Sequence, residues 1–303
     1  MSAPSVPMIR QTAGAGAARS AARRRNGVGS ERRPRWLTYT LLTLALLVSA
    51  YPLYFAVQLA SSTSAEIAQN PIPTLLPGGE LLDNIKRVLE ADIDLWQAML
   101  NSLIVSTATA VSVVMFATLA GYSFAKLRFR GRRPLLVFVI ATMAVPTQLG
   151  VVPLFIVMRE LGLVGSLWAV ILPGMVTAFG VFWMTQYLDA ALPYELIEAA
   201  RVDGASMLRT FWSVALPAAR PAATMLGLFT FIASWTNFFW PSIVLGTKNP
   251  TLPVALQLLQ AGFFKDIALI MAGVVVSVIP LIVLFVVAGR QLVAGIMQGA
   301  VKG

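Results

Sequence analysis

The chain has 303 residues, of which 57% are hydrophobic and 12% are charged, and its mean hydropathy is +0.77. Soluble domains carry about 25% charged residues, so the composition indicates a membrane protein. The sequence contains no Cys and no His, which excludes disulfides, thiolate metal sites and the commonest general base. We therefore expect no catalytic residue, no metal and no cofactor.

Residues 1–35 consist largely of Ala, Gly, Ser and Arg, and their eight basic residues are all arginines. Such a segment buries too little apolar surface to fold, so we expect a disordered tail. An arginine cluster could bind nucleic acid or anionic lipid. The positive-inside rule gives it a simpler role, which is to keep the N-terminus in the cytoplasm. We therefore expect no nucleic-acid partner.

Six apolar runs follow, each near the ~20 residues that a spanning helix needs. The first far exceeds the ~7–15-residue core of a signal peptide, so we expect an uncleaved helix over 36–60. Residues 61–94 are polar and acidic and predict an extracytoplasmic loop. The core of the protein is expected over 95–290, before a short cytoplasmic tail at 291–303. Its transmembrane helices are predicted at about 99–125, 135–158, 167–187, 222–245 and 267–288.

The basic residues give the orientation of these helices. With the N-terminus inside, the inner segments hold 18 of the 23 Lys and Arg residues and the outer segments hold five. This asymmetry predicts that both termini are cytoplasmic. The inner segments are 1–35, 126–133, 189–220 and 290–303.

No Asp, Glu, Lys or Arg lies within the six predicted spans. Intramembrane charge marks proton relays, ion sites and voltage sensors, so its absence argues against an ion-coupled transporter. We also find no two-fold internal repeat of the kind that secondary transporters show.

Several uncharged polar or aromatic residues do lie in the spans. Gln148, Trp183, Trp235 and Asn237 are our candidates for a solute path, since amides and flat indole faces suit a polyhydroxylated solute. The alternative is that they only join neighbouring helices or, for Trp, anchor the membrane interface.

The inner loop 189–220 contains a polar, amphipathic stretch. Pro193 suits a first helical turn, and Glu195 complements the helix dipole. Glu198 and Arg201 are placed to pair. Asp203-Gly204 should break the helix, and a second helix should run over 205–215 until Pro217 stops it.

The predicted product is a helix–Gly–helix hairpin that lies parallel to the membrane and has a large apolar face. Helices that bind lipid surfaces are usually rich in Lys and Arg. This loop has four acidic and three basic residues, so a protein partner fits better.

Within this loop, Glu198-Ala199-Ala200-x-x-Asp203-Gly204, followed by Leu216-Pro217, resembles the EAA loop of ABC importer permeases. Further motifs are similar to the carbohydrate-uptake, maltose-type branch, and two of them look most like permeases for cellobiose-type sugars. These motifs are Asn101-Ser102, Gly121-Tyr122, the pair Pro146 and Pro153, Trp235-x-Asn237-Phe-Phe-Trp-Pro241, Asn249–Ala255 and Ile296–Gly299 with the chain end.

The resemblance implies an all-α membrane protein of six transmembrane helices, of the type I ABC importer permease kind, in a bacterial plasma membrane. Its implied partners are a second permease subunit in a heterodimer, two copies of a cytoplasmic ABC ATPase, an extracytoplasmic sugar-binding protein and membrane lipid. The implied solute is a di- or oligosaccharide, and ATP hydrolysis belongs to the separate ATPase. The EAA residues named above would dock to that ATPase.

Two alternatives remain at this point. One is an ABC permease for another solute, such as glycerol phosphate, a polyamine or an amino acid. The other is a membrane protein with a structural or signalling role. The sequence departs from the family at Trp235-Thr236-Asn237, where relatives often carry an acid, and the Arg-rich N-terminus matches no family pattern.

Overall fold

The computed structural model describes residues 36–70, 72, 75–91, 93–260 and 266–300, with side chains up to residue 289. The expected tail at 1–35 and the last three residues of the expected tail at 291–303 lie outside the described residues. The chain divides into two units, up to Tyr54 and from Phe55 onward, and each is described by itself.

Every regular element in the described ranges is a helix, as the sequence predicts. Helix α2 (Trp36–Ala60) makes up the described part of the first unit and ends in the second. Its 25 residues are long and apolar enough to cross a membrane. The other helices are α3 (Ser64–Gln69), α4 (Leu81–Glu90), α5 (Leu95–Lys126), α6 (Arg132–Thr142), η1 (Thr147–Gly150), α7 (Val151–Glu160), α8 (Trp168–Gly174), α9 (Ala178–Ala191), α10 (Tyr194–Val202), α11 (Met207–Thr210), η2 (Phe211–Ala215), α12 (Leu216–Trp235), α13 (Phe239–Val244), α14 (Leu252–Leu258) and α15 (Ile267–Ala300).

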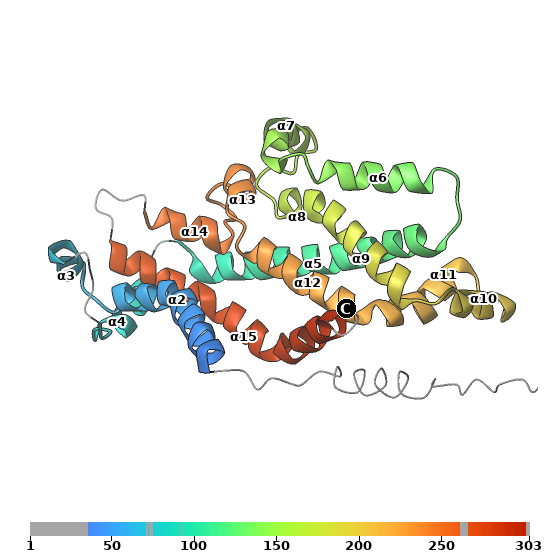
Figure 1. Ribbon diagram of the computed structural model, residues 1–303. Helices are drawn as coiled ribbons and strands as arrows, with labels where there is room; N and C mark the ends of the chain where they lie inside the picture. Colours follow the sequence, from blue (N-terminus) through green and yellow to red (C-terminus); the bar gives the residue numbers. More distant parts are fainter. Residues whose placement is uncertain (1–35, 71, 73–74, 92, 261–265, 301–303) are drawn as a thin grey trace, which may run out of the picture. The chain divides into compact units, whose positions relative to one another are not determined.

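The centre of the second unit is the long helix α5, which packs along α9 and α12 (Figure 1). Val113, Met184 and Leu226, one from each helix, are almost fully buried in their common core. Gly121 lets α5 and α9 approach closely, since a Cβ built on it would lie 2.7 Å from the Cβ of Met184. Small residues at such a contact are typical of helix packing in membranes.

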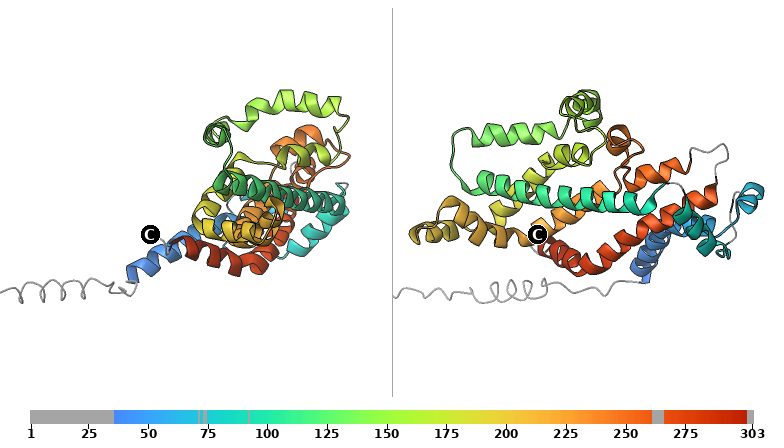
Figure 2. Two further views of the ribbon diagram at one scale, coloured as in Figure 1. Left: turned by 90° about the vertical axis from the view of Figure 1, so that its right-hand side faces the viewer. Right: turned by 180° about the vertical axis from the view of Figure 1, so that it is seen from behind.

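Two groups of short helices lie at opposite ends of this unit, as Figures 1 and 2 both show. Helices α10 and α11 lie at one end, beside the connection from α5 to α6. Helices α4 and α14 lie at the other end. Helices α10 and α11 and helices α4 and α14 therefore lie at opposite ends of α5.

Within the described residues, four helices are long and apolar enough to cross a membrane by themselves, namely Trp36–Ala60, Leu95–Lys126, Met207–Trp235 and Ile267–Gly289. Two bent helix pairs also qualify by length and composition, which brings the count to six if each pair is one span. The all-α architecture expected from the sequence is therefore found.

The third expected helix, 135–158, is not continuous. Helices α6 and α7 meet at 90°, with the short 3-10 helix η1 between them. Pro146 precedes η1 in an extended conformation. A proline has no N–H to donate and disfavours helix in the residue before it, so the break occurs where Pro146 stands.

The fourth expected helix, 167–187, is also divided. Helices α8 and α9 meet at 40°, just after Pro173 and Gly174. The hydroxyl of Thr177 then caps α9 by accepting a hydrogen bond from the Gly180 N–H at 3.0 Å. Helix α9 continues to Ala191, four residues past the expected end.

The expectation that Pro217 stops the second hairpin helix is wrong. The helix runs without interruption from Met207 to Trp235 and joins the hairpin to the fifth span. A π-helical turn over Phe211–Ala215 precedes the proline, and the Leu216 N–H donates to the Phe211 carbonyl. A π-helical turn already departs from the regular i→i−4 hydrogen bonds of an α-helix. Pro217, which has no N–H to donate, therefore follows a segment whose hydrogen bonds are already irregular.

Candidate functional site

The stretch from 193 to 217 forms a hairpin at the end of the α5–α9–α12 core. Helix α10 ends at Val202 with Asp203 as its C-cap, and Gly204 follows with φ of +75°. Glycine adopts this left-handed conformation without the strain that a Cβ causes. The Ser206 hydroxyl then caps α11 by accepting a hydrogen bond from the Arg209 N–H at 3.3 Å. The predicted helix–Gly–helix geometry is therefore present.

Two apolar side chains anchor the hairpin to the core. Ile197 of α10 is fully buried, and Phe211 is 2% exposed. The ring of Phe211 lies 5.9 Å from the ring of Tyr122 on α5, measured between centroids. Burial of such side chains contributes roughly 1.5–3 kcal/mol each, so both arms of the hairpin are held against the membrane helices.

The opposite face of the hairpin is apolar and exposed. Val202 is 87% exposed, and Met207, Leu208 and Trp212 are each more than half exposed. The apolar side chains of the second helix do not share one face, since Phe211 is buried whereas Met207, Leu208 and Trp212 are exposed. Exposed apolar patches of this kind mark interaction sites.

The motif residues lie on or beside this face. Glu198, Ala199, Asp203 and Gly204 are exposed, whereas Ala200, Leu216 and Pro217 are half-buried. No ion pair joins Glu198 to Arg201 in the described residues. Instead, both side chains line a hollow of about 310 Å³ together with Leu127, Arg128, Tyr194 and Met207.

The four candidate path residues lie in different surroundings. Gln148 is exposed in η1, at the 90° bend. Asn237 is half-buried in the turn between α12 and α13. Trp183 packs against the core and donates from Nε1 to the Ala222 carbonyl at 3.2 Å.

Trp235 is 3% exposed, stacks on Phe231 and donates from Nε1 to the Ser277 carbonyl at 3.3 Å. Its N–H and ring faces are thus used inside the protein. Within the described residues, no hydrogen bond or ring contact joins any two of the four candidates, so the structure does not bring them into one site.

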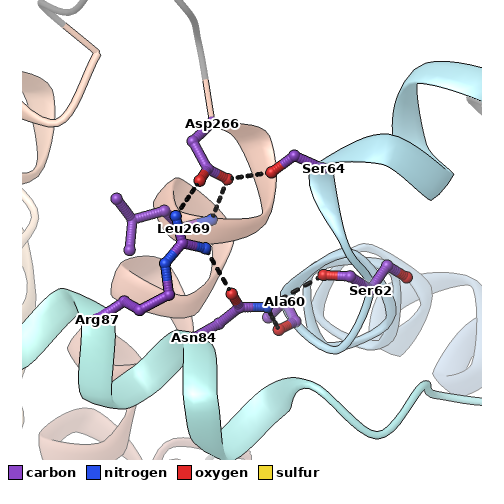
Figure 3. A network of polar contacts seen from close by, with 7 residues as sticks. All are labelled: Ala60, Ser62, Ser64, Asn84, Arg87, Asp266 and Leu269. Atoms are coloured by element: carbon purple, nitrogen blue, oxygen red, sulfur yellow. Dashed lines mark hydrogen bonds and ion pairs between the residues drawn. The ribbon is translucent and has the colours of Figure 1, made fainter.

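A polar network that the sequence analysis did not single out lies at the other end of the unit (Figure 3). Asp266, just before α15, accepts from the Ser64 hydroxyl at 2.7 Å and from the Leu269 N–H at 3.0 Å, and it pairs with Arg87 of α4. Asn84 accepts from Arg87 at 2.9 Å and donates to the carbonyls of Ala60 and Ser62.

The charge of Asp266 is stabilised by these contacts. Burial by itself would raise the pKa of the carboxyl. The hydrogen bonds from Leu269, Ser64 and Arg87, with the positive charge of Arg87, outweigh burial and hold the pKa below its usual value of 3.8. Nothing in the sequence pattern pairs Arg87 with Asp266, because the two are 179 positions apart.

A second set of long-range hydrogen bonds fixes α14 to α5. The buried Asn101 donates to the Pro250 carbonyl at 2.9 Å, and the Ser102 hydroxyl accepts from the Leu252 N–H at 2.7 Å. Asn249 donates to the Gly165 carbonyl at 2.8 Å and extends the set to the loop before α8. The resemblance pointed to these positions, but only the structure shows their partners.

Among the described residues, no group of three or more Asp, Glu, His or Cys side chains could hold a metal ion.

Residues 114–294 match the model of the family described as "Binding-protein-dependent transport system inner membrane component".

Three curated relatives match over almost their full length. The chain is 30% identical to the arabinooligosaccharides transport system permease protein AraQ of Halalkalibacterium halodurans, covering 88% of this chain and 96% of that protein. It is 28% identical to the lactose transport system permease protein LacG of Rhizobium radiobacter, covering 89% and 97%. It is also 28% identical to the sn-glycerol-3-phosphate transport system permease protein UgpE of Yersinia pestis, covering 86% and 95%.

A solved structure supports the same assignment. A chain of a bacterial ABC transporter that imports the acidic polysaccharide alginate superposes with a TM-score of 0.71 at 26% identity, over 84% of this chain and 94% of that one. The match confirms the resemblance to ABC importer permeases and the fold that it implies. The chain therefore belongs to the family of inner membrane components of binding-protein-dependent transport systems.

Proposed function

We propose that this multi-pass membrane protein is a permease subunit of an ATP-driven ABC importer and forms half of the path for a di- or oligosaccharide. The observation that carries the proposal is the hairpin at 193–217, which presents an exposed apolar face and continues into a membrane-length helix. A surface of this kind can receive a force from a partner and pass it to a span.

The partner at the hairpin is a cytoplasmic ABC ATPase. The surface combines the apolar side chains of Val202, Met207, Leu208 and Trp212 with the exposed carboxylates of Glu198 and Asp203. Aromatic and Met side chains are enriched at protein interfaces. Docking would involve Glu198, Ala199, Ala200, Asp203 and Gly204, together with Leu216 and Pro217 at the start of α12.

Energy enters through this partner rather than through the spans. The six expected spans contain no Asp, Glu, Lys or Arg, and the chain lacks the Gly-rich lysine loop that cradles phosphates in P-loop ATPases. ATP binding and hydrolysis in a separate subunit would move the hairpin. The permease would then alternate between inward-facing and outward-facing states, which requires that the two states bind their partners with different affinities.

The complex contains a second permease subunit as a heterodimeric partner, two ATPase copies and an extracytoplasmic sugar-binding protein. Both termini and the hairpin face the cytoplasm, since 18 of 23 basic residues belong to that side. In this orientation α14 and the Arg87–Asp266 network face the binding protein. The position of these elements at the end of α5 opposite the hairpin supports the assignment.

The solute is proposed to be a neutral sugar because AraQ and LacG are named for arabinooligosaccharides and lactose. Gln148 and Asn237 are proposed to contact it, since neither amide is part of a described hydrogen bond through its side chain. Trp183 and Trp235 would reach the solute only in another state of the transport cycle. The relative UgpE supports glycerol phosphate as the second candidate solute.

The test is transport by the complete system. The permease pair, the ATPase and the binding protein are reconstituted in proteoliposomes, with ATP on the ATPase side. We expect uptake of a neutral oligosaccharide and ATPase stimulation by the loaded binding protein. Stimulation by glycerol 3-phosphate but by no neutral oligosaccharide would contradict the sugar assignment and favour the second candidate.

A further inference from the structure

The joint between α9 and α10 is bridged by residues 126–128, at the end of α5 and the start of the loop that follows it. Helix α9 ends at Ala191, and α10 begins at Tyr194. The two residues between them, Leu192 and Pro193, have extended backbones, with ψ of 102° and 145°. Because they have left the helical conformation, no continuous helix transmits motion from α10 to α9.

On the α9 side of this joint, Lys126 holds the chain. Its Nζ donates to the Asp189 carbonyl oxygen at 3.1 Å and lies 3.9 Å from the Asp189 carboxylate. Lys126 is only 6% exposed, so this ammonium group is held inside the protein. A buried cation of this kind requires its partner to remain in place.

On the α10 side, Arg128 holds the chain. Its guanidinium carbon lies 5.6 Å from the centroid of the ring of Tyr194. Tyr194 is the first residue of α10. Arg128 also lines a hollow together with Glu198 and Arg201, two exposed charged residues of the hairpin. Leu127, between the two basic residues, packs against the core.

From this geometry we infer that Arg128 is a positioning residue for transport, and that segment 126–128 is a brace across the α9–α10 joint. Leu192 of the joint and Ile197 of α10 are both buried in the core. The contact between Arg128 and Tyr194 adds a further point of attachment at the first residue of α10. Hairpin motion then moves α5 and α9 together instead of being lost at Leu192-Pro193. The inference rests on the proposed function in taking the hairpin as the docking site of the ATPase.

The first experiment measures the hairpin directly, without any solute. The chain contains no Cys, so Arg130→Cys and Glu195→Cys, both at exposed positions, carry the only two spin labels of this chain and report the distance across the brace. Pulsed electron–electron double resonance is recorded on the full chain with its permease partner in lipid nanodiscs. We expect a narrow distance distribution in the labelled parent and a clearly broadened one after Arg128→Ala.

Further variants separate the brace from a general loss of structure. Tyr194→Phe keeps the aromatic face and should retain the narrow distribution, whereas Tyr194→Leu should broaden it. The double variant Arg128→Ala/Tyr194→Leu should be no broader than either single variant, since both remove the same contact. Arg133→Ala is the matched control, because Arg133 is an exposed arginine of the same connection without a described contact to the hairpin.

The second experiment measures ATP hydrolysed per neutral oligosaccharide imported in proteoliposomes. A surface cation–π contact can shift an equilibrium about two- to fivefold, and we expect the ratio to rise by about that factor in Arg128→Ala and Tyr194→Leu. A distribution as narrow in Arg128→Ala as in the parent would overturn the brace. A broadened distribution with an unchanged ratio would overturn its role in transport. Failure of the parent itself to respond to loaded binding protein would instead contradict the proposed function.

Discussion

Arg87 and Asp266 form an ion pair that joins α4 to the start of α15, between side chains that are 50% and 22% exposed. Ser64 and the Leu269 N–H bind the same carboxylate. The pair is therefore part of a network and not an isolated surface contact, and networks of this kind contribute more than single exposed pairs.

We predict that Asp266→Asn lowers the free energy of unfolding by about 1–2 kcal/mol, because a charge-assisted hydrogen bond and an ion pair are lost. Thermal unfolding in detergent, followed by Trp fluorescence, measures the change. Asp83→Asn is the control, since the pair of Asp83 with Lys86 is about 70% exposed on both sides. Equal effects of the two substitutions would show that the network adds nothing.

The lowered pKa of Asp266 predicts that the stability of the protein depends on pH. Its folded-state pKa is lowered from 3.8, so its contribution to stability is complete above about pH 5 and is lost as the pH falls through the folded-state pKa. Unfolding midpoints should fall less steeply below pH 4 in Asp266→Asn than in the parent. Parallel curves for the two proteins would mean that another group dominates the acid response.

Asn101 and Ser102 should matter through the groups that they satisfy on α14. Ser102→Ala leaves the Leu252 N–H without its acceptor, and Asn101→Ala leaves the Pro250 carbonyl without its donor. An unsatisfied buried group costs about 1–3 kcal/mol, and we expect that loss of stability in each variant. Ser123→Ala serves as the control, because the Ser123 hydroxyl donates to the Leu119 carbonyl of its own helix. The rate of limited proteolysis in the loop before α14 gives a second measurement of this loss.

Gly121→Ala should prevent close packing of α5 and α9. The added methyl would lie 2.7–2.9 Å from the Met184 Cβ, the Met184 carbonyl carbon and the Thr185 nitrogen, two of which are backbone atoms. Overpacking costs about 1–3 kcal/mol, and we expect lower yield and a lower unfolding midpoint. Gly289→Ala, where no atom lies within 4 Å, should behave like the parent.

Gly204→Ala tests the hairpin against a control with the same backbone strain. Gly204 and Gly162 have φ of +75° and +69°, and neither has an atom within 4 Å of a built Cβ. Both alanine variants should lose about 1 kcal/mol of stability. Only Gly204→Ala should weaken co-purification of the ATPase, because Gly162 lies outside the hairpin. Equal co-purification from both variants would argue against docking at the turn.

The sequence predicted the helical class, because apolar runs of ~20 residues can be recognised along a single chain. It also predicted the break at Gly204. It did not predict that α6 and α7 meet at 90°. A proline marks where a helix can break, but the angle depends on the packing of both pieces.

The error at Pro217 has a related origin. Proline usually ends a helix because it lacks a donor, and the sequence gives no sign of the wide turn over Phe211–Ala215 that accommodates it. The ion pair expected between Glu198 and Arg201 is likewise absent from the described contacts, where both residues line the hollow beside Arg128. Contacts between distant segments, such as Arg128 with Tyr194, leave no periodic signal in a single sequence.

Because the helix from Met207 to Trp235 is uninterrupted, the number of residues in it sets the direction and the distance of the hairpin relative to the span. Each residue of a helix adds about 100° of rotation and about 1.5 Å of rise. One alanine inserted after Pro221 would turn the exposed face of the hairpin by about 100° relative to the span, although no existing side chain would be altered. Four inserted residues would restore the direction to within about 40° but displace the hairpin by about 6 Å. Angular phase and reach are thus fixed by residue count, independently of residue identity.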